Sequence, residues 1–459
     1  MLAQIEAINS AVNGVVWGPI MLVLLVGTGI YLTFRTRGLQ ARRFGYILRN
    51  TIGTLFSKDK KKSDSQHNLT PFQAVSTALA GTVGTGNIAG VTGAIFVGGP
   101  GAVFWMWVSA FFGMMTKYAE IVLAVKYRQV DEKGAHYGGP MYYIEKGAGQ
   151  KWLAILFALL GGIACFGIGN IAQSTEIAGA VQSLTGLDPL YTGIILAILT
   201  AIVVIGGVKR IGQVASYLVP FMAIFYIAAG VAVIVLRISD VPAALASIFT
   251  QAFSLEPREI GGGVAGYTIM VSMQQGVARG VFSNEAGLGS APMAHAASDT
   301  QEPVEQGMWG VFEVFVDTIV ICTLTSMAIL LSGVLEYDLS SFASNGAAAA
   351  AAFNAILPGT IGGTVLQISL LFFALSTILG WSYYGERCWG YLSNNNKVVN
   401  YIFKIAFVLM CIVGSVGSGA LMWDISDTLN GMMAIPNLVG LLLLSGTVIR
   451  LTREYFVKK

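Results

Sequence analysis

Two glycine-rich stretches carry residue types that could bind small ions and charged groups through their backbone. The first, GTVGTGNIAGVTGA, runs from Gly81 to Ala94 and contains five glycines among its fourteen residues. The second, GVFSNEAGLGSA, runs from Gly280 to Ala291. Both lie inside apolar segments, although glycine is the poorest helix former after proline. Where a helix unwinds, its free carbonyl oxygens suit a cation and its free amide groups suit a carboxylate.

The sequence shows no arrangement typical of a catalytic centre. Its three histidines, His67, His136 and His295, fall in predicted loops and fit neither an HExxH nor a GxSxG motif. The four cysteines lie in or beside apolar segments, at spacings that fit neither a disulfide framework nor a metal site. We therefore predict that the protein is not an enzyme.

Composition indicates the environment in which these stretches fold. The chain has 459 residues, of which 55% are hydrophobic and only 11% are charged, and its mean hydropathy is +0.69. A soluble domain has about 25% charged residues. So few charges cannot cover a water-facing surface of this size, and a net charge of +3 gives no reason to expect nucleic acid as a partner. The composition predicts an integral membrane protein.

Eleven apolar segments are long enough to be considered as membrane spans. Only helices and closed barrels satisfy every backbone group in lipid, and the alternating pattern of a barrel is absent. The N-terminus lacks a basic region, so we interpret its first segment as a retained helix rather than a cleaved signal. We predict an all-α integral membrane protein with eleven transmembrane helices, at 15–34, 71–97, 101–125, 152–180, 190–207, 213–236, 262–290, 307–334, 362–385, 399–419 and 429–449.

The distribution of lysine and arginine predicts the orientation. The loop 35–62 holds nine of the twenty-seven basic residues, which places it in the cytoplasm. Counting spans from this loop puts the N-terminus outside and the C-terminus inside. One loop departs from the rule, because HAASDTQEPVEQ has three acids and no lysine or arginine, although it should be cytoplasmic.

The two glycine-rich stretches align as repeats at an offset of 197 residues. The alignment places Asn87 on Asn284, and the same offset places Glu120 on Asp317 in the following span. Five spans separate the two copies, so the second copy enters the membrane from the opposite side. Inverted repeats with an interrupted helix at matching positions are typical of secondary transporters.

The repeat predicts how the chain is divided. We expect an extra N-terminal helix with a basic cytoplasmic loop at 1–68, a first five-helix repeat at 69–237, and a second repeat with the cytoplasmic tail at 238–459. The alternative for either stretch is close helix packing through small residues, for which Gly86 and Gly90 have the required spacing.

Two motifs resemble a known family. GVFSNEAGLGSAPMAHAA at 280–297 and ALAGTVGTGNIAGVTGAIFVGGPGAVFWMW at 78–107 are similar to the alanine/glycine:cation symporter family of prokaryotes, and the resemblance covers essentially the whole chain. It implies a leucine-transporter-like fold and Na⁺-coupled import of alanine or glycine by alternating access, with H⁺ as the less frequent ion. It also implies a prokaryotic plasma membrane, no prosthetic group, and a chain that we expect to be monomeric.

The resemblance also implies the site residues. Backbone amides near Thr85 and Gly86 would hold the substrate carboxylate, and neutral oxygens from the first break and the ninth span would hold Na⁺. The implied substrate-binding residues are Gly81, Thr82, Thr85, Gly86, Asn87, Phe166, Asn170, Gln274, Gln275, Gly276 and Trp381. The implied sodium ligands are the carbonyls of Ala80, Val83 and Phe373 and the side chains of Ser376 and Thr377.

Several of these residues have a simpler interpretation. Ser376 and Thr377 could bond back to a carbonyl one turn earlier in their own helix. An amide inside a span, such as Asn170, often joins neighbouring helices, and a mid-span Phe166 often only packs. We expect the second break near Gly276, where the preceding glutamines could face the ligand.

Four carboxylates lie inside predicted spans, where they are costly unless paired or protonated. We interpret them mainly as a structural or gating network with Lys117 and Arg279 as partners, and a proton relay is the alternative. A channel is a further alternative, but it would need a continuous polar pore, and paired helix breaks disfavour it. The four acids are Glu120, Glu285, Glu313 and Asp317.

Overall fold

The computed structural model describes residues 2–56, 67–254, 258–260, 263–265, 269–417 and 419–458. Three parts of the sequence prediction lie outside these ranges. They are the lysines at 58 and 60–62 of the basic loop, residues 262 and 266–268 at the start of the seventh apolar segment, and residue 418 near the end of the tenth.

The described chain is almost entirely helical, with two short antiparallel hairpins, β1–β2 and β3–β4. The α-helices are α1 (Leu2–Val16), α2 (Pro19–Arg35), α3 (Leu39–Arg42), α4 (Phe44–Asn50), α5 (Pro71–Thr82), α6 (Ala89–Gly98), α7 (Gly101–Lys126), α8 (Pro140–Lys146), α9 (Lys151–Phe166), α10 (Ala172–Thr185), α11 (Pro189–Val204), α12 (Gly207–Leu236), α13 (Val241–Ala252), α14 (Ile269–Asn284), α15 (Pro292–Ala296), α16 (Pro303–Val314), α17 (Thr323–Leu331), α18 (Asn345–Ile356), α19 (Ile361–Leu392), α20 (Lys397–Val416) and α21 (Gly419–Lys458). The strands are β1 (Gln129–Val130), β2 (His136–Tyr137), β3 (Arg258–Ile260) and β4 (Gly263–Ala265).

Short 3₁₀ and π segments complete or join these helices. The π segments η3 and η4 make α9–α10 and α16–α17 continuous, and the 3₁₀ turn η2 lies between α5 and α6. Such segments often mark functional positions in a helix. They are η1 (Ile52–Phe56), η2 (Thr85–Asn87), η3 (Gly167–Ile171), η4 (Phe315–Cys322), η5 (Val334–Glu336) and η6 (Leu339–Ser341).

Most of the predicted spans correspond to helices of sufficient length. Eight helices in the described residues are long and apolar enough to cross a membrane, and a ninth span results if the bent pair of α5 and the helical segment Thr85–Gly98 is counted as one span. The remaining two predicted segments correspond to α11 and α14, each of 16 residues. Helix length and composition therefore support a multi-pass membrane protein without reproducing the count of eleven.

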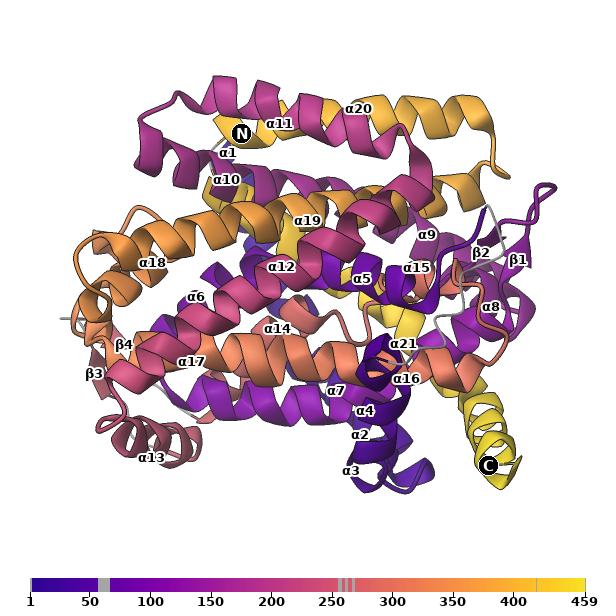
Figure 1. Cartoon of the computed structure of the whole chain (residues 1–459), viewed down its shortest axis with the longest axis horizontal. Helices are drawn as coiled ribbons and strands as arrows, with labels where there is room; N and C mark the ends of the chain where they lie inside the picture. The colour runs from indigo at the N-terminus through magenta and orange to yellow at the C-terminus, as the bar shows by residue number, and fades with distance from the viewer. Residues whose placement is uncertain are drawn as a thin grey trace.

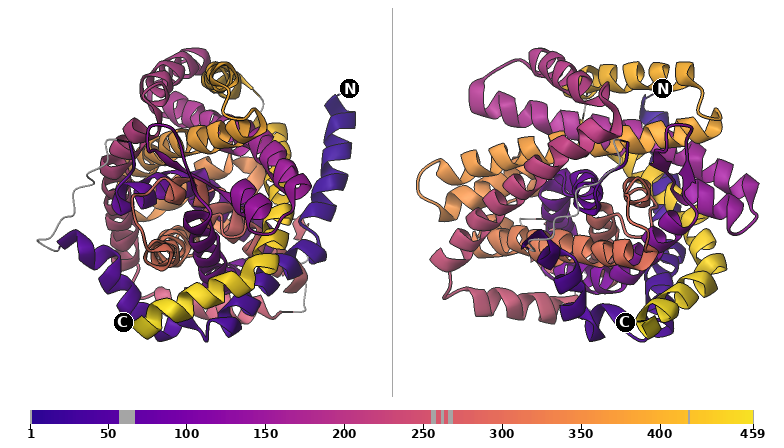
Figure 2. Two further views of the ribbon diagram at one scale, coloured as in Figure 1. Left: turned by 90° about the vertical axis from the view of Figure 1, so that its right-hand side faces the viewer. Right: turned by 45° about the vertical axis from the view of Figure 1, so that its right-hand side comes forward.

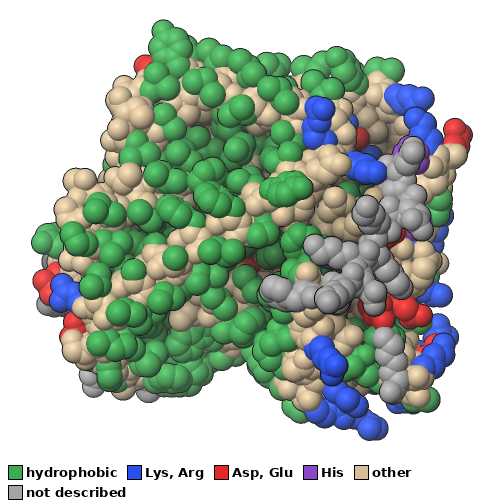
Figure 3. Space-filling view, in the orientation of Figure 1, with side chains coloured by type: hydrophobic (Ala, Val, Ile, Leu, Met, Phe, Trp, Pro, Cys, Tyr) green, Lys and Arg blue, Asp and Glu red, His purple; other side chains and the backbone are tan. Residues whose placement is uncertain are grey.

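The surface has the character expected of a membrane protein. Hydrophobic side chains cover most of the face in Figure 3, whereas Lys and Arg gather toward the right-hand side, the side of α8 and the C-terminus in Figure 1. Large apolar side chains on α11, α12 and α20 are exposed, among them Ile198, Tyr217 and Tyr401. α11 and α20 lie side by side at the edge of the molecule (Figures 1 and 2).

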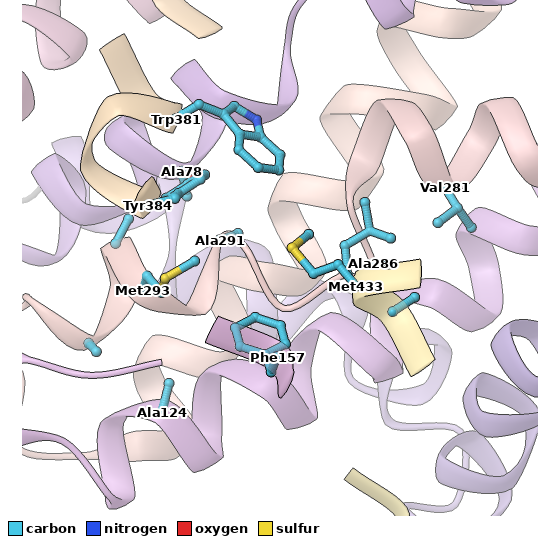
Figure 4. Packing of buried hydrophobic residues seen from close by; sticks show 14 of the residues in the cluster. Ala78, Ala124, Phe157, Val281, Ala286, Ala291, Met293, Trp381, Tyr384 and Met433 are labelled. Atoms are coloured by element: carbon cyan, nitrogen blue, oxygen red, sulfur yellow. The ribbon is translucent and has the colours of Figure 1, made fainter. Parts of the chain in front are cut away.

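The two glycine-rich stretches lie in the interior of the bundle. α5 packs against α12, α15 and α19, and α14 packs against α6 and α7. Figure 4 shows the side chains of Trp381, Met433 and Phe157 gathered around the chain between Ala286 and Ala291. Residues far apart in the sequence therefore meet at the second stretch.

Candidate functional site

The first glycine-rich stretch is a broken helix. α5 starts with a capping box between Thr70 and Gln73 and ends at Thr82, and the chain bends by 58° before it continues as α6. In a continuous helix the amide of Gly84 would donate to the carbonyl of Ala80. Here it donates to Asn87 Oδ1, at 2.9 Å. The carbonyls at the end of α5 are thereby released from the helical pattern, as the glycine content predicts.

The break is lined by buried polar groups. The amide of Thr85 donates to Gln173 Oε1 at 3.3 Å, and Gln173 donates from Nε2 to the carbonyl of Ile168 at 3.0 Å. Among the described residues Thr85 Oγ1 has no hydrogen-bond partner although it is fully buried. An unpaired buried hydroxyl is costly, so this position suits a polar ligand.

Sequence reasoning missed Gln173. A signal was present, because Gln173 is a second amide three residues after Asn170 in the same apolar segment. What the sequence did not provide was the packing of α10 against α19, which brings the amide to the break.

The oxygens implied as sodium ligands come together beside the first break. Ser376 Oγ donates to the carbonyl of Phe373 at 2.8 Å and lies 3.5 Å from the carbonyl oxygen of Val83. Thr377 Oγ1 also donates to Phe373, at 3.0 Å, and a Cβ added to Gly84 would overlap Thr377 Oγ1. α19 thus presents two hydroxyls to the end of α5, where Ala80 lies.

These hydroxyls do bond back within their helix, as the simpler interpretation expects. A hydroxyl that donates its hydrogen to a carbonyl still has two lone pairs. Back-bonding to Phe373 and binding of a cation are therefore compatible at Ser376 and Thr377.

Neighbouring side chains lie close to the glycines of the break. A Cβ added to Gly81 would lie 2.8 Å from the Tyr384 hydroxyl oxygen, and one added to Gly86 would lie 3.0 Å from a ring carbon of Phe282. Thr82 Oγ1 bonds back to the carbonyl of Ala78 at 3.3 Å. A residue larger than glycine would therefore not fit at either position without movement of its neighbours.

The predicted position of the second break is wrong. α14 is continuous through Gln274, Gln275 and Gly276, and the helix ends only at Asn284. One glycine costs a helix only about 1 kcal/mol, which the surrounding packing can offset. Gln274 Nε2 donates to the carbonyl of Trp17 at 3.1 Å, so it joins α14 to the N-terminal helices.

The second break consists of residues 285–291, between α14 and α15. Glu285, Gly287 and Gly289 have φ angles of 56°, 95° and 82°, a left-handed conformation that favours glycine. Lys117 Nζ donates to the carbonyl of Asn284 at 2.8 Å, and the amide of Gly289 donates to a carboxylate oxygen of α7 at 3.1 Å. Charged groups therefore hold this break.

Acids from each half of the chain reach the break of the other half. Asp317, after the second break, accepts from Asn87 Nδ2 at 2.7 Å. Glu120, after the first break, is the acid that accepts from the amide of Gly289. Ser283 Oγ, beside the second break, also donates to Asp317 at 2.6 Å.

A buried network surrounds Lys117. Its ammonium group lies 3.1 Å from Glu313 Oε1, and His295 Nε2 lies 3.1 Å from Glu313 Oε2. Gln306 Nε2 lies 2.8 Å from the other ring nitrogen of His295, so the arrangement fits a histidine that donates from Nε2. The sequence placed His295 in a loop, whereas it lies in α15 and is fully buried.

Arg279 has a different partner from the one predicted. It forms an ion pair of 3.1 Å with Asp427 of α21, not with one of the four intramembrane acids. A signal in the sequence was present, because Asp427 lies just before the last predicted span.

Three predicted substrate residues lie elsewhere in the packing. Asn170 Nδ2 donates to the carbonyl of Phe407 at 2.7 Å, and Phe166 packs on Phe407 and Phe403, with ring centroids 6.0 and 5.5 Å apart. Both side chains thus contact α20, in agreement with the simpler interpretation. Trp381 Nε1 donates to Glu285 Oε1 at 2.8 Å, which joins α19 to the second break.

A cavity of about 820 Å³ lies at one end of the breaks. Residues from α6, α10, α14, α18 and α21 line it, among them Gly90, Gln275, Arg279 and Asp424. At the other end the chain before α5 pairs with the chain after α15, where the Leu69 amide donates to the carbonyl of Ala297 at 2.9 Å. The two ends of the broken helices are therefore unlike.

A bundle with two interrupted helices, uncharged oxygens at one break and a cavity at one end defines a secondary transporter of the leucine-transporter fold. Solved transporters have the same fold. MhsT in complex with L-phenylalanine aligns with a TM-score of 0.59 and 16% identity, over 86% of this chain and 99% of that one. A Na⁺-coupled sialic acid symporter aligns with a TM-score of 0.56 and 14% identity, over 94% and 87%.

Sequence comparison gives the family. The chain belongs to the sodium:alanine symporter family, which it matches over residues 2–459. It is 48% identical to the sodium/alanine symporter AgcS of Methanococcus maripaludis, over 97% of this chain and 96% of the relative. It is also 40% identical to the uncharacterized transporter YflA of Bacillus subtilis, over 96% and 92%. The protein is therefore a Na⁺-coupled amino-acid symporter of this family.

Proposed function

We propose that the protein imports small neutral amino acids, alanine or glycine, together with Na⁺ by alternating access. The observation that carries the proposal is the meeting of Val83, Phe373, Ser376 and Thr377 beside the unwound end of α5. Neutral oxygens from two elements are a reasonable shell for a hard cation. An ion between α5 and α19 would hold these two elements together.

The substrate would bind at the same break. The amides near Thr85 and Gly86 would hold its carboxylate, and Gln173 and Thr85 Oγ1 supply further polar groups. Tyr384 and Phe282 lie close to Gly81 and Gly86, so a large side chain would not fit. The resemblance to AgcS, a sodium/alanine symporter, supports the choice of alanine.

The asymmetry between the two ends of the breaks supports alternating access. The cavity lined by Gly90 and Arg279 would be the external entrance, and the paired chains at Leu69 and Ala297 would close the cytoplasmic end. Lys and Arg gather on the side of α8 and the C-terminus, which fits a cytoplasmic location of that side (Figures 1 and 3). An N-terminus outside and a C-terminus inside are part of the proposal. A prokaryotic plasma membrane and a monomer are part of the proposal.

The division of the chain is proposed on the same basis. Glu120 and Asp317 correspond at the offset of 197 residues, and each contacts the break of the other half, at Gly289 and Asn87. They support an inverted repeat of 69–237 and 238–459, with 1–68 as an addition.

Uptake into proteoliposomes tests the proposal. We expect labelled alanine or glycine to accumulate when Na⁺ is high outside, and accumulation to stop when the gradient is collapsed. Uptake that a proton gradient drives equally well without Na⁺ would contradict the sodium assignment. Uptake that never exceeds equilibrium under any gradient would indicate a channel.

Competition tests the size of the pocket. Unlabelled leucine and phenylalanine should inhibit alanine uptake poorly, because Tyr384 and Phe282 restrict the space at Gly81 and Gly86. Serine, which is close to alanine in size, is the matched competitor and should inhibit well. Strong inhibition by phenylalanine would contradict the small-pocket proposal.

A further inference from the structure

Glu120 is a buried acid with incomplete hydrogen bonding. It lies on α7 with no exposed surface, and its Oε1 accepts from the Gly289 amide at 3.1 Å and from Asn437 Nδ2 at 2.5 Å. Its other oxygen, Oε2, has no hydrogen-bond partner among the described residues, and neither has Thr116 Oγ1. Thr116 is four residues before Glu120, on the same face of the helix.

In the other three intramembrane acids, both carboxylate oxygens have a hydrogen bond or an ion pair. Glu313 forms its ion pair with Lys117 and contacts His295. Asp317 accepts from three side-chain donors on its two oxygens. Glu285 accepts on both oxygens, from Trp381 and Ser290. Only Glu120, among these described acids, has an oxygen that receives neither a hydrogen bond nor an ion pair.

Glu120 also lacks a cation of its own. In the described part of the chain Lys117 is the one lysine or arginine among the buried side chains, and it is already paired with Glu313. An ionised carboxylate without a counter-ion is very costly to bury in a membrane protein. Neutralisation by a proton removes this cost. A metal cation would need several more oxygens than Glu120 Oε2 and Thr116 Oγ1.

We propose that Glu120 is a proton-binding site, at which Oε2 carries a proton in this conformation. When the second break moves and water reaches the carboxyl group, the O–H bond breaks, its electrons stay on Oε2 and the proton passes to water. This goes beyond the proposed function, because Na⁺-coupled uptake does not itself require a proton site beside the second break.

The groups that face this site set its titration. From α7 itself Lys117 faces it, and from the second break the Gly289 amide contacts Oε1. From α21 Asn437, which is uncharged, contacts Oε1, and Tyr143 of α8 donates in turn to Asn437. Glu313 of α16 and His295 of α15 lie beyond Lys117 in the same network.

Infrared spectroscopy of the purified full-length protein tests the proposal without any transport assay. Near neutral pH surface carboxyl groups are ionised. A remaining carbonyl stretch of a protonated acid would then come from a buried group. We expect this band in the parent protein, its loss in Glu120→Gln, and its persistence in the matched variant Asp317→Asn. Identical spectra of the parent and Glu120→Gln would overturn the proposal.

Two further measurements test the proposal if Glu120→Gln does not fold or if the acid binds Na⁺ instead of a proton. If Glu120→Gln does not fold, Glu120→Asp retains an acid in an altered position, and its band should shift instead of disappearing. Loss of the acid band on addition of Na⁺ at constant pH would mean that the group binds Na⁺, and would also overturn the proposal. A band that behaves as expected in a protein without Na⁺-driven uptake would contradict the proposed function and leave the proton site standing.

Discussion

The two glycine-rich stretches align at an offset of 197 residues, yet the helix breaks within them lie at different places, at residues 83–88 and 285–291, and are built differently. The first has no positive φ angle within residues 83–87, all of which the structure describes, and it is closed by the amide side chains of Asn87 and Gln173. The second has three positive φ angles and is held by the ionisable side chains of Lys117 and Glu120.

This difference suggests a division of roles. Exchanging one uncharged hydrogen bond for another changes the free energy by only about 1 kcal/mol, so the first break can respond to an ion or substrate. Separating a buried ion pair costs roughly 3–5 kcal/mol. Movement of the second break should therefore cost more free energy, because Lys117, which is paired with Glu313, also donates to the carbonyl of Asn284 at this break.

The largest effect should follow from Lys117→Met. The variant leaves Glu313 buried without its cation and the carbonyl of Asn284 without its donor, at a cost of roughly 3–5 kcal/mol in the free energy of unfolding. We expect a clear fall of the thermal unfolding midpoint in detergent, followed by tryptophan fluorescence.

The double variant Lys117→Met with Glu313→Gln is the control for this prediction. It removes the unpaired charge and should recover much of the lost stability. Equal stability of Lys117→Met and the parent would show that the charge of Lys117 does not hold the second break. The contrast between the two breaks would then be wrong.

A pair of glycine substitutions should have the next largest effect. Gly289→Ala places a Cβ 2.6 Å from Pro140 Cγ in a residue with φ of 82°, which combines overpacking of about 1–3 kcal/mol with left-handed strain of about 1–2 kcal/mol. Gly90→Ala, in α6 after the first break, meets nothing within 4 Å. We expect a lower thermal unfolding midpoint for Gly289→Ala and an unchanged or higher one for Gly90→Ala. The reverse order would contradict the inference that the second break is the more rigid of the two.

Thr377→Val tests the ion-binding role of the first break. Valine keeps the shape of threonine but removes Oγ1, and loss of a dipole to a charged group costs roughly 1.5–3 kcal/mol. We expect Na⁺ affinity to fall by about ten- to a hundredfold. Linkage then requires weaker alanine binding at subsaturating Na⁺ and recovery at saturation. The measurement is alanine binding to the purified variant across a Na⁺ titration.

Ser369→Ala is the matched control in the same helix. Ser369 is also buried and bonds back one turn, to Val365 at 2.8 Å, but its hydroxyl is not among those beside the first break. It should leave the Na⁺ midpoint unchanged. An unshifted midpoint in a folded Thr377→Val protein would remove Thr377 from the ion site.

Local chemistry made the first break predictable from the sequence. Five glycines among fourteen residues in an apolar segment can hardly form a regular helix, and the side chain of Asn87 is well suited to cap the unwound turn. Family resemblance then placed Ser376 and Thr377 opposite this break, a position that composition and spacing could not give, because α19 lies almost three hundred residues away in sequence.

Tertiary packing explains what the sequence did not reveal. The end of α14 depends on left-handed backbone at residues 285–289, so the prediction of a break at Gly276 was wrong. The role of Gln173 depends on the contact between α10 and α19, and the partner of Arg279 on the approach of α21. Such contacts join residues that no local pattern relates.

The smallest effect concerns the contact that ties the two broken helices together, the pairing of Leu69 with Ala297 and Asp299. His136 Nδ1 lies 2.8 Å from the carbonyl oxygen of Ser298 in this contact, and burial holds the pKa of His136 below 6.5. Because the folded state disfavours protonation, its stabilisation is complete above pH 6.5 and declines as pH falls through the lowered pKa. The effect is small, since the imidazole is only partly buried and water screens its charge.

Hydrogen exchange of backbone amides measures this decline, with His136→Gln as the control for the intrinsic effect of pH on exchange. After correction, the protection of the Leu69 and Asp299 amides should fall below pH 6.5 in the parent and not in the variant. The amides of Val83 and Glu285, which close the last turns of α5 and α14, should keep their protection. An equal loss at all four amides would mean that the breaks are held by the contact between the broken helices. The uncharged and charged groups at each break would then not account for its rigidity, because both would loosen together when a distant histidine gains a proton.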